Sequence, residues 1–114
     1  MHWTEIAERR AGGAVVLEVR GHLTLSDQEA SLYRHVSRLV DDGARTLVLN
    51  LRHVSYVDSV GVGEIVRTYM LVTNRGGRLT LCEVGPRVRE VIETTQLDSV
   101  LKMVDSEAEA LAFR

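Results

Sequence analysis

Apolar and polar residues alternate early in the chain with the period of a β-strand. In residues 14–20 the odd-numbered positions are apolar, whereas the even-numbered positions include Glu18 and Arg20, so one face is more polar than the other. Residues 3–9 predict a strand before this one. The Gly-Gly pair within residues 11–13 suits a tight connection, so the two strands are expected to form a hairpin.

Three later apolar runs also predict strands. Residues 46–51 are almost continuously apolar, which is typical of a central strand covered on both faces. Residues 79–84 predict a further strand, and residues 101–104 predict a last, short one.

Four helices are predicted between and after these strands. Ser26 and Glu29 have the spacing of a capping box before the first helix, and Ser106 and Glu109 have it before the last. Pro86 is acceptable at the start of the third helix. Apolar residues three and four apart give the first three helices a buried stripe. These stripes are Leu32, Val36, Leu39 and Val40; Val62, Ile65, Val66, Tyr69 and Met70; and Val88, Val91 and Ile92.

The resulting order is β-β-α-β-α-β-α-β-α, which predicts one α/β domain over residues 1–114. Strands that alternate with helices indicate a mixed, mostly parallel sheet with helices packed on it, and the opening hairpin adds an antiparallel pair. Right-handed crossovers place the strand-to-helix turns at the carboxyl edge of such a sheet. That edge is where open α/β proteins usually bind ligands.

One of these turns, residues 58–63, reads Asp-Ser-Val-Gly-Val-Gly. Asp58 or Ser59 can cap the helix by accepting a hydrogen bond from a backbone N–H group of its first turn. The remaining N–H groups and the helix dipole favour an anion there. Gly61 and Gly63 leave this turn without side-chain bulk, so another molecule can approach the backbone. The sequence therefore predicts a turn that handles a phosphate or a partner.

Composition narrows the class of protein. The chain has 114 residues, 45% of them hydrophobic, and a formal net charge of -2, so no basic field indicates direct nucleic-acid binding. No apolar run approaches the roughly 20 residues that span a bilayer. The N-terminus lacks the pattern of a signal peptide. The single cysteine, Cys82, excludes an internal disulfide and is interpreted as a small core residue. We expect a soluble cytoplasmic domain.

The common catalytic and cofactor motifs are missing. Residues 61–66 begin like a dinucleotide-binding GxGxxG motif but end in valine, and no P-loop is present. Residues 57–61 lack the first glycine of a GxSxG nucleophile elbow. Asp105, Glu107 and Glu109 are interpreted as acids that favour the dipole of the last helix. The prediction is therefore no enzyme, no catalytic residues, no cofactor and no metal, with a serine-dependent enzyme as the least favoured alternative. The histidines, without metal-site or catalytic spacing, are His2, His22, His35 and His53.

Segments along the whole chain match a known family. The most specific is Asp-Ser-x-Gly-Val-Gly, within residues 57–63, and the others support it in the same order. The chain resembles the STAS domain and, among STAS proteins, the bacterial anti-sigma-factor antagonists. The supporting segments are Gly21-His22-Leu23, residues 47–51, residues 76–81, the helix at Pro86 and residues 108–111.

The resemblance implies a binding module controlled by phosphorylation. In the family, the serine directly after the aspartate is phosphorylated by a partner that is both anti-sigma factor and serine kinase; here that position is Ser59. The unphosphorylated antagonist binds the anti-sigma factor and frees the sigma factor, and a phosphatase restores this form. Val60 stands where antagonists often have a small or hydroxylated residue, which makes Ser59 the sole acceptor in the turn. Oligomeric state is left open, a homodimer included.

The resemblance also implies a partner-binding surface made of the phosphoacceptor turn, the helix after it and the loop after the second strand. An alternative within the family is a STAS subunit of a lipid-transport ABC complex or of a stress-signalling scaffold. In addition, Gln96 stands in a turn where the family commonly has a glycine. The partner-binding residues implied are Gly21, His22, Leu23, Thr24, Asp58, Ser59, Val60, Gly61, Val62, Gly63, Glu64 and Arg67.

Overall fold

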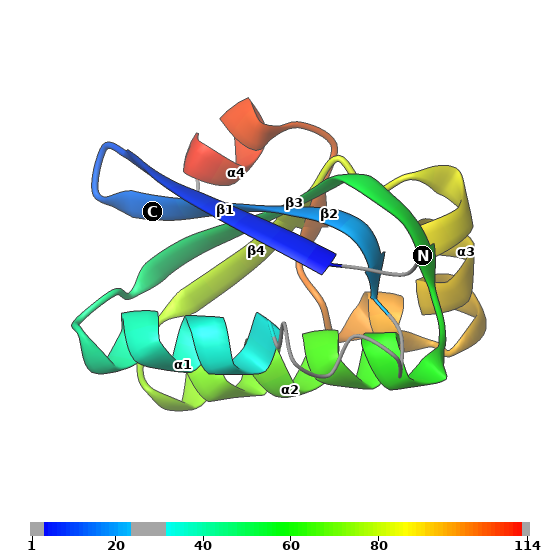
Figure 1. Cartoon of the computed structure of the whole chain (residues 1–114), viewed down its shortest axis with the longest axis horizontal. Coiled ribbons are helices and arrows are strands. Elements are labelled where there is room, and N and C mark those ends of the chain that lie inside the picture. The colour runs from blue at the N-terminus through cyan, green and yellow to red at the C-terminus, as the bar shows by residue number, and fades with distance from the viewer. Residues whose placement is uncertain (1–3, 24–31, 113–114) are drawn as a thin grey trace.

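The computed structural model describes residues 4–23 and 32–112, which form one sheet with helices on both of its faces (Figure 1). The predicted order of strands and helices is confirmed. The elements are β1 (Thr4–Ala11), β2 (Ala14–Leu23), α1 (Leu32–Asp41), β3 (Thr46–Val57), α2 (Ser59–Asn74), β4 (Arg78–Cys82), α3 (Pro86–Thr94), the 3-10 helix η2 (Leu97–Ser99), β5 (Met103–Val104) and α4 (Glu107–Ala112).

The five strands lie in the sheet in the same order as in the chain, β1-β2-β3-β4-β5. β1 and β2 form the predicted antiparallel hairpin. β2 pairs with β3, β3 with β4 and β4 with β5, all in parallel. The prediction of a mixed, mostly parallel α/β sheet is therefore confirmed, and its helix-preceding turns gather at the carboxyl end of the parallel strands.

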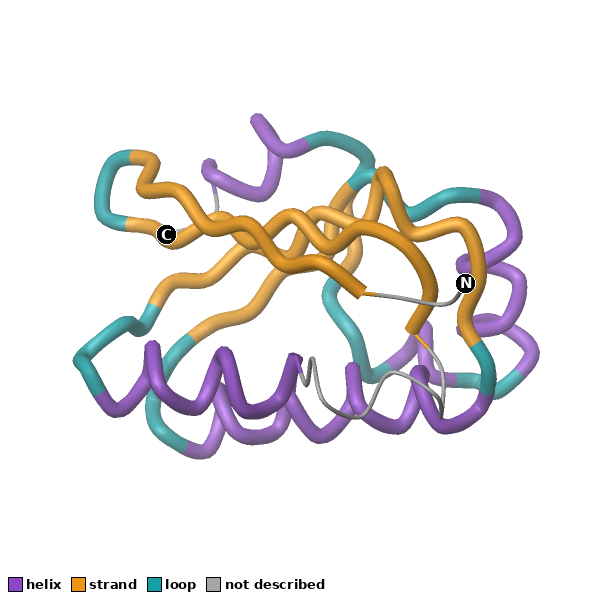
Figure 2. Tube along the Cα trace, in the orientation of Figure 1, coloured by secondary structure: helices purple, strands orange, loops and turns teal. Residues whose placement is uncertain are grey.

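Two cores form because successive side chains of a strand point to opposite faces of the sheet. α1 and α2 lie side by side on one face, and α4 lies on the other (Figure 2). Leu17, Leu49 and Leu81 are fully buried in the main core on the α1 and α2 side. Under α4, the smaller core consists of Val16, Val48, Cys82 and Ala110. Burial raises the pKa of the Cys82 thiol to about 12, so this cysteine is the inert core residue expected.

β3 is longer than the apolar run at 46–51 predicts. It continues to Val57 although Arg52, His53, Ser55 and Tyr56 are exposed. The extension is held by pairing with the end of β2, where Gly21 lies opposite Val54. The β2–β3 register shifts beside Gly21, whose φ of 100° lies in the left-handed region that favours glycine. The extended strand ends one residue before α2, so Asp58 alone connects the two.

The predicted stripe of α2 is wrong at Met70, which is 52% exposed. At 100° per residue, Met70 lies about 140° around the helix from the fully buried Ile65. Thr68 lies about 60° from Ile65 and is buried instead, because its hydroxyl donates to the Glu64 carbonyl at 2.8 Å. No helix within the described residues is long and apolar enough to cross a membrane.

The other boundaries differ in smaller ways. The strand predicted at 101–104 is limited to Met103–Val104, while Leu101 is buried outside it. The strand predicted at 79–84 ends at Cys82, because Glu83 turns to a φ of 53°. Gln96, in the turn where the family commonly has a glycine, has a φ of 62°. The capping box at Ser26 and Glu29 lies outside the described residues.

Candidate docking site at the start of helix α2

Asp58, not Ser59, caps helix α2. The Asp58 backbone is extended, and its Oδ1 accepts the N–H of Gly61 at 2.9 Å. The Asp58 carbonyl accepts the N–H of Val62 at 2.9 Å, which is the first backbone bond of the helix. The choice that the sequence left open is thus decided in favour of the aspartate. Ser59 becomes the first helical residue and is exposed.

The two glycines of this turn differ in their surroundings. Gly61 is buried and supplies the N–H group that Asp58 binds. Gly63 is half-buried, and a Cβ added there would meet only the Nη1 atom of Arg67 within 4 Å, at an ordinary contact distance of 3.5 Å. Packing against the described residues therefore does not require glycine at Gly63. Among those residues, only the Arg67 guanidinium enters the room that the missing side chain leaves along the helix.

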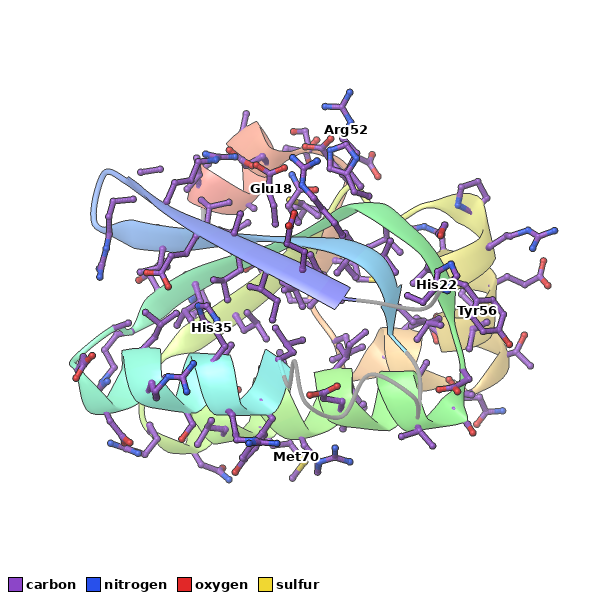
Figure 3. All side chains as sticks on the ribbon, viewed as in Figure 1. Glu18, His22, His35, Arg52, Tyr56 and Met70 are labelled. Carbon is purple, nitrogen blue, oxygen red and sulfur yellow. The ribbon has the colours of Figure 1, made fainter. Side chains whose placement is uncertain are left out.

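An aromatic pair lies beside the serine. His22 at the end of β2 and Tyr56 at the end of β3 are opposite each other in the sheet, and their rings meet edge to face at 5.9 Å and 72°. Figure 3 shows both side chains near the end of the sheet that leads into α2. Tyr56 is 49% exposed and Val60 is 37% exposed. Large apolar side chains thus flank Ser59 on both sides in the chain.

Sequence reasoning missed Tyr56 as a surface residue. The signal available in the sequence was an aromatic residue that follows the polar residues Arg52 and His53 and comes shortly before the Asp-Ser pair. Within a single buried strand such a tyrosine is a core residue. In the structure Tyr56 pairs with His22 just after the register shift beside Gly21, and it is exposed.

The remaining predicted site residues differ in whether they lie at the turn and are exposed. Leu23 ends β2 opposite Val57, so the end of this strand lies directly beside the turn, whereas Thr24 lies outside the described residues. Glu64 is half-buried, and its Oε2 accepts the N–H of Tyr33 at 3.1 Å, so this carboxylate faces α1. Arg67 is exposed on the same helix.

The contacts of the described histidines are with residues other than Ser59. His35 bonds Glu8 through its Nε2 at 2.7 Å, and His53 lies 3.8 Å from Glu18. His22 is the histidine next to the turn, and it packs on Tyr56. No hydrogen bond joins Ser59 to a histidine within the described residues, and these residues contain no cluster of metal-ligating side chains. Within the described residues, Ser59 is therefore an exposed hydroxyl to which no histidine is hydrogen-bonded.

A second polar cluster lies on the opposite face of the sheet, at the start of α4. Arg9 Nη2 donates to Glu107 Oε1 at 2.6 Å, and Asn50, only 5% exposed, donates to Glu83 and to Glu107 at 3.2 Å each. The hydrogen bond from Arg9 lowers the pKa of the Glu107 carboxyl. From its position in the sequence, Glu107 was interpreted only as an acid that favours the dipole of α4. In the structure it also accepts hydrogen bonds from Arg9 and Asn50. It ties α4 to β1 and β3.

A cavity of about 410 Å³ lies at the other end of α2, where Tyr69 and Thr73 face the start of β4. Its remaining lining is Gly77, Arg78, Leu79 and Lys102. Because Tyr69 and Thr73 are in the second half of α2, this cavity is separate from the turn at Ser59.

Comparisons with known proteins agree with one another. BtrV of Bordetella bronchiseptica, named as a candidate anti-sigma factor antagonist, is 31% identical over 103 residues, which is 90% of this chain and 88% of that protein. The anti-sigma F factor antagonist of Paenibacillus polymyxa is 32% identical over 65 residues, and this match spans only 57% of this chain and 56% of that protein.

A solved relative shares the fold over nearly its whole length. The anti-sigma factor antagonist SpoIIAA in its unphosphorylated form has a TM-score of 0.76 and 27% identity, covering 94% of this chain and 93% of that one. The Bacillus SpoIIAA in its phosphorylated form has a TM-score of 0.72 and 25% identity, covering 95% and 97%. The family model of the STAS domain matches residues 5–110. This chain belongs to the STAS domain family.

Proposed function

We propose that this domain is an anti-sigma-factor antagonist. In its unphosphorylated form, the start of α2 binds an anti-sigma factor that is also a serine kinase, and sigma factor is released. Phosphorylation of Ser59 by that partner switches the antagonist off, and a phosphatase restores it. The anti-sigma factor acts on sigma factor, a subunit of RNA polymerase, so the proposal places this domain in the cytoplasm. Relatives named as anti-sigma factor antagonists support it.

The observation that carries this proposal is that Asp58 caps α2 while Ser59 is exposed. Because the Asp58 carboxylate accepts the Gly61 N–H, the Ser59 hydroxyl is not needed to cap the helix. Ser59 is exposed at the first position of α2. A kinase can therefore reach and modify this hydroxyl without breaking the cap. A solved phosphorylated form of the relative SpoIIAA supports modification in this family.

The surface around Ser59 has the character of a protein-binding patch. Tyr56 and Val60 are among the exposed large hydrophobic residues within the described part of the chain, and His22 packs on Tyr56. Tyrosine is enriched at protein interfaces, where it supplies a large contact area. Gly61 and Gly63 add no bulk between these residues and the helix backbone. The proposed contact residues are the phosphoacceptor turn, the aromatic pair and the end of β2.

Phosphorylation of this patch opposes binding by charge. It adds about -1.5 to -2 charges at neutral pH, directly after the Asp58 carboxylate. Like charges brought together at an interface cost several kcal/mol, and each 1.4 kcal/mol is about tenfold in affinity. The start of a helix tolerates an anion, so the domain itself keeps its fold. The switch therefore acts on the complex.

The test incubates the full chain with a purified kinase-type anti-sigma factor from the same genome and labelled ATP. Label is expected on the wild type and on Ser55→Ala, but not on Ser59→Ala. Ser55 is a matched control because it is also exposed, four residues earlier on β3. The unphosphorylated domain should bind the anti-sigma factor tightly in the presence of ADP, and the phosphorylated domain should bind it weakly. Binding of a transporter or scaffold subunit, with no label and no anti-sigma factor bound, would favour the alternative STAS function instead.

A further inference from the structure

The side chain of Arg67 lies back along α2 toward Ser59. Its Nη1 is 3.5 Å from the place that a Cβ of Gly63 would occupy. Ser59, Gly63 and Arg67 are spaced four residues apart, so they follow one another on the same side of the helix. The Cα–Cβ bonds of a helix tilt toward its N-terminus, which directs a long side chain the same way. The missing side chain at Gly63 leaves this path open.

Arg67 has no carboxylate of the described residues within ion-pair distance. The acid spaced to pair with it is Glu64, three residues earlier on α2. Glu64 instead accepts the backbone N–H of Tyr33 at 3.1 Å, which turns its carboxylate toward α1. A cation on the exposed side of α2 thus lies beside the phosphoacceptor turn with no acidic partner among the described residues.

The distance to Ser59 is within reach of a phosphate. Eight helical residues rise about 12 Å, and the Arg67 side chain already covers about 6 Å of that rise by reaching Gly63. The serine side chain, its phosphoryl group and a charge-assisted hydrogen bond of about 2.8 Å span the remaining turn of helix. Arginine suits this task, because its planar guanidinium binds phosphate through two parallel hydrogen bonds.

We infer that a phosphate on Ser59 is held within the domain by Arg67, which reaches it across Gly63. This inference rests on the proposed phosphorylation of Ser59 and adds a second part to the switch. The unmodified domain presents the Arg67 guanidinium on the docking surface beside the serine. Phosphorylation adds negative charge there and also draws this cation into an internal ion pair. One modification thereby removes a positive contact and creates a negative one.

The test installs phosphoserine at position 59 of the full chain during synthesis, so that it needs no kinase. The second ionisation of the phosphate, with an ordinary pKa of about 6, is followed by phosphorus NMR. An arginine in contact favours the doubly charged form. We expect a pKa about 0.5 unit or more lower in the otherwise wild-type chain than in Arg67→Gln. The other titratable groups near the turn are Asp58, directly before Ser59, and His22, which packs on Tyr56, and both are the same in all chains compared.

Two further variants sharpen the test. Gly63→Leu keeps Arg67 but fills its path, so it should raise the phosphate pKa as Arg67→Gln does. Arg78→Gln removes an equal charge at the start of β4, next to the cavity at the other end of α2, and should leave the pKa unchanged. The Arg67 side-chain N–H signal should also shift on phosphorylation in the wild type and stay in place in Gly63→Leu.

Equal phosphate titrations in the wild type and Arg67→Gln would overturn the inference. That result is separate from the fate of the proposed function. If phosphoserine fails to weaken binding of the anti-sigma factor while the titrations differ, the proposed switch fails and the ion pair stands. If binding is lost while the titrations coincide, the switch stands and Arg67 has no part in holding the phosphate.

Discussion

The chain contains two helix starts of nearly the same design, and they are used differently. Residues 58–63 read Asp-Ser-Val-Gly-Val-Gly before and into α2, and residues 105–110 read Asp-Ser-Glu-Ala-Glu-Ala before and into α4. In α2 the aspartate is the cap and the serine is the exposed first residue. In α4 the serine is the cap, because Ser106 Oγ accepts the N–H of Glu109 at 3.2 Å. The helix start is thus shifted by one residue between the two Asp-Ser pairs, so the serine hydroxyl caps α4 but not α2.

The residues after each Asp-Ser pair continue the contrast. α2 has glycines, an exposed valine and Arg67, which forms no ion pair with the described residues, and all of these suit contact with another molecule. α4 has alanines, of which Ala110 is buried, and Glu107 is bonded to Arg9 and Asn50. At the start of α4 the polar side chain of Glu107 therefore holds the helix against the sheet, whereas Ser59 and Arg67 of α2 are exposed.

The largest expected effect is on partner binding. Ser59→Asp places a permanent negative charge on the proposed docking surface and should weaken binding of the anti-sigma factor about 30-fold or more, or about 2 kcal/mol. Ser106→Asp is the matched control at the other Asp-Ser pair, and it keeps a good capping residue. It should leave the affinity unchanged in titration calorimetry. Equal losses in both variants would mean that the effect is general and not local to α2.

The next largest effect is on the free energy of unfolding, and it differs between Asp58 and Asp105. Asp58→Ala removes the cap of the long helix α2 and should lower the free energy of unfolding by about 1 kcal/mol. Asp105→Ala removes an exposed residue next to a serine cap and should stay within about 0.5 kcal/mol of the wild type. Urea denaturation measures both. A larger loss for Asp105→Ala would show that the caps are assigned wrongly.

Replacing Gly63 by alanine, the residue type found in the first turn of α4, tests whether the stability of the domain requires this glycine. Gly63→Ala should raise the free energy of unfolding by about 0.5–1 kcal/mol, because alanine favours the helix and its Cβ meets Arg67 at an ordinary 3.5 Å. Gly77→Ala is the opposite case, since its Cβ would lie 2.6 Å from the Arg45 carbonyl oxygen. It should destabilise the domain in the same denaturation series. A Gly63→Ala variant that is less stable would contradict the open space beside this residue.

The smallest effect concerns Glu107 and pH. Its carboxyl pKa is lowered in the folded state by the hydrogen bond from Arg9. The stability it contributes is therefore present above its unfolded-state pKa and is lost as pH falls through the lower, folded value. Because both partners are partly exposed, about 0.5 kcal/mol is expected. Glu107→Gln should differ more from the wild type at about pH 6 than at about pH 3. In an Arg9→Met background this difference between the two pH values should shrink.

Much of the fold was predictable because its signals are local. The alternation in residues 14–20, the apolar run at 46–51 and the spacing of helical stripes depend only on near neighbours in the chain. The Ser106 cap was also predictable, and its hydrogen bond to Glu109 is confirmed. The prediction for Met70 was wrong because five similar apolar residues were fitted to one stripe, whereas the packed helix buries Thr68 and Val72.

The site was predictable as a segment but not as an arrangement. The motif at residues 58–63 predicted the turn between β3 and α2, and the family resemblance implies that Ser59 is phosphorylated, which stays a prediction. Tyr56 was missed, because its exposure depends on how the ends of β2 and β3 pair. The direction of Glu64 toward Tyr33 was equally out of reach, since α1 and α2 meet only in the folded chain.

By itself the sequence determined the order of strands and helices, the single α/β domain and the place of the Asp-Ser turn at residues 58–63, because periodicity and capping chemistry act over a few residues. Tertiary structure decided which residue caps α2, since β3 runs on to Val57 only by pairing with β2. It also decided the contact between Arg9 and Glu107, 98 residues apart in the chain, and turned Glu64 toward α1, away from the pairing with Arg67 that its spacing allows. These outcomes depend on which elements pack together, and no local pattern encodes that.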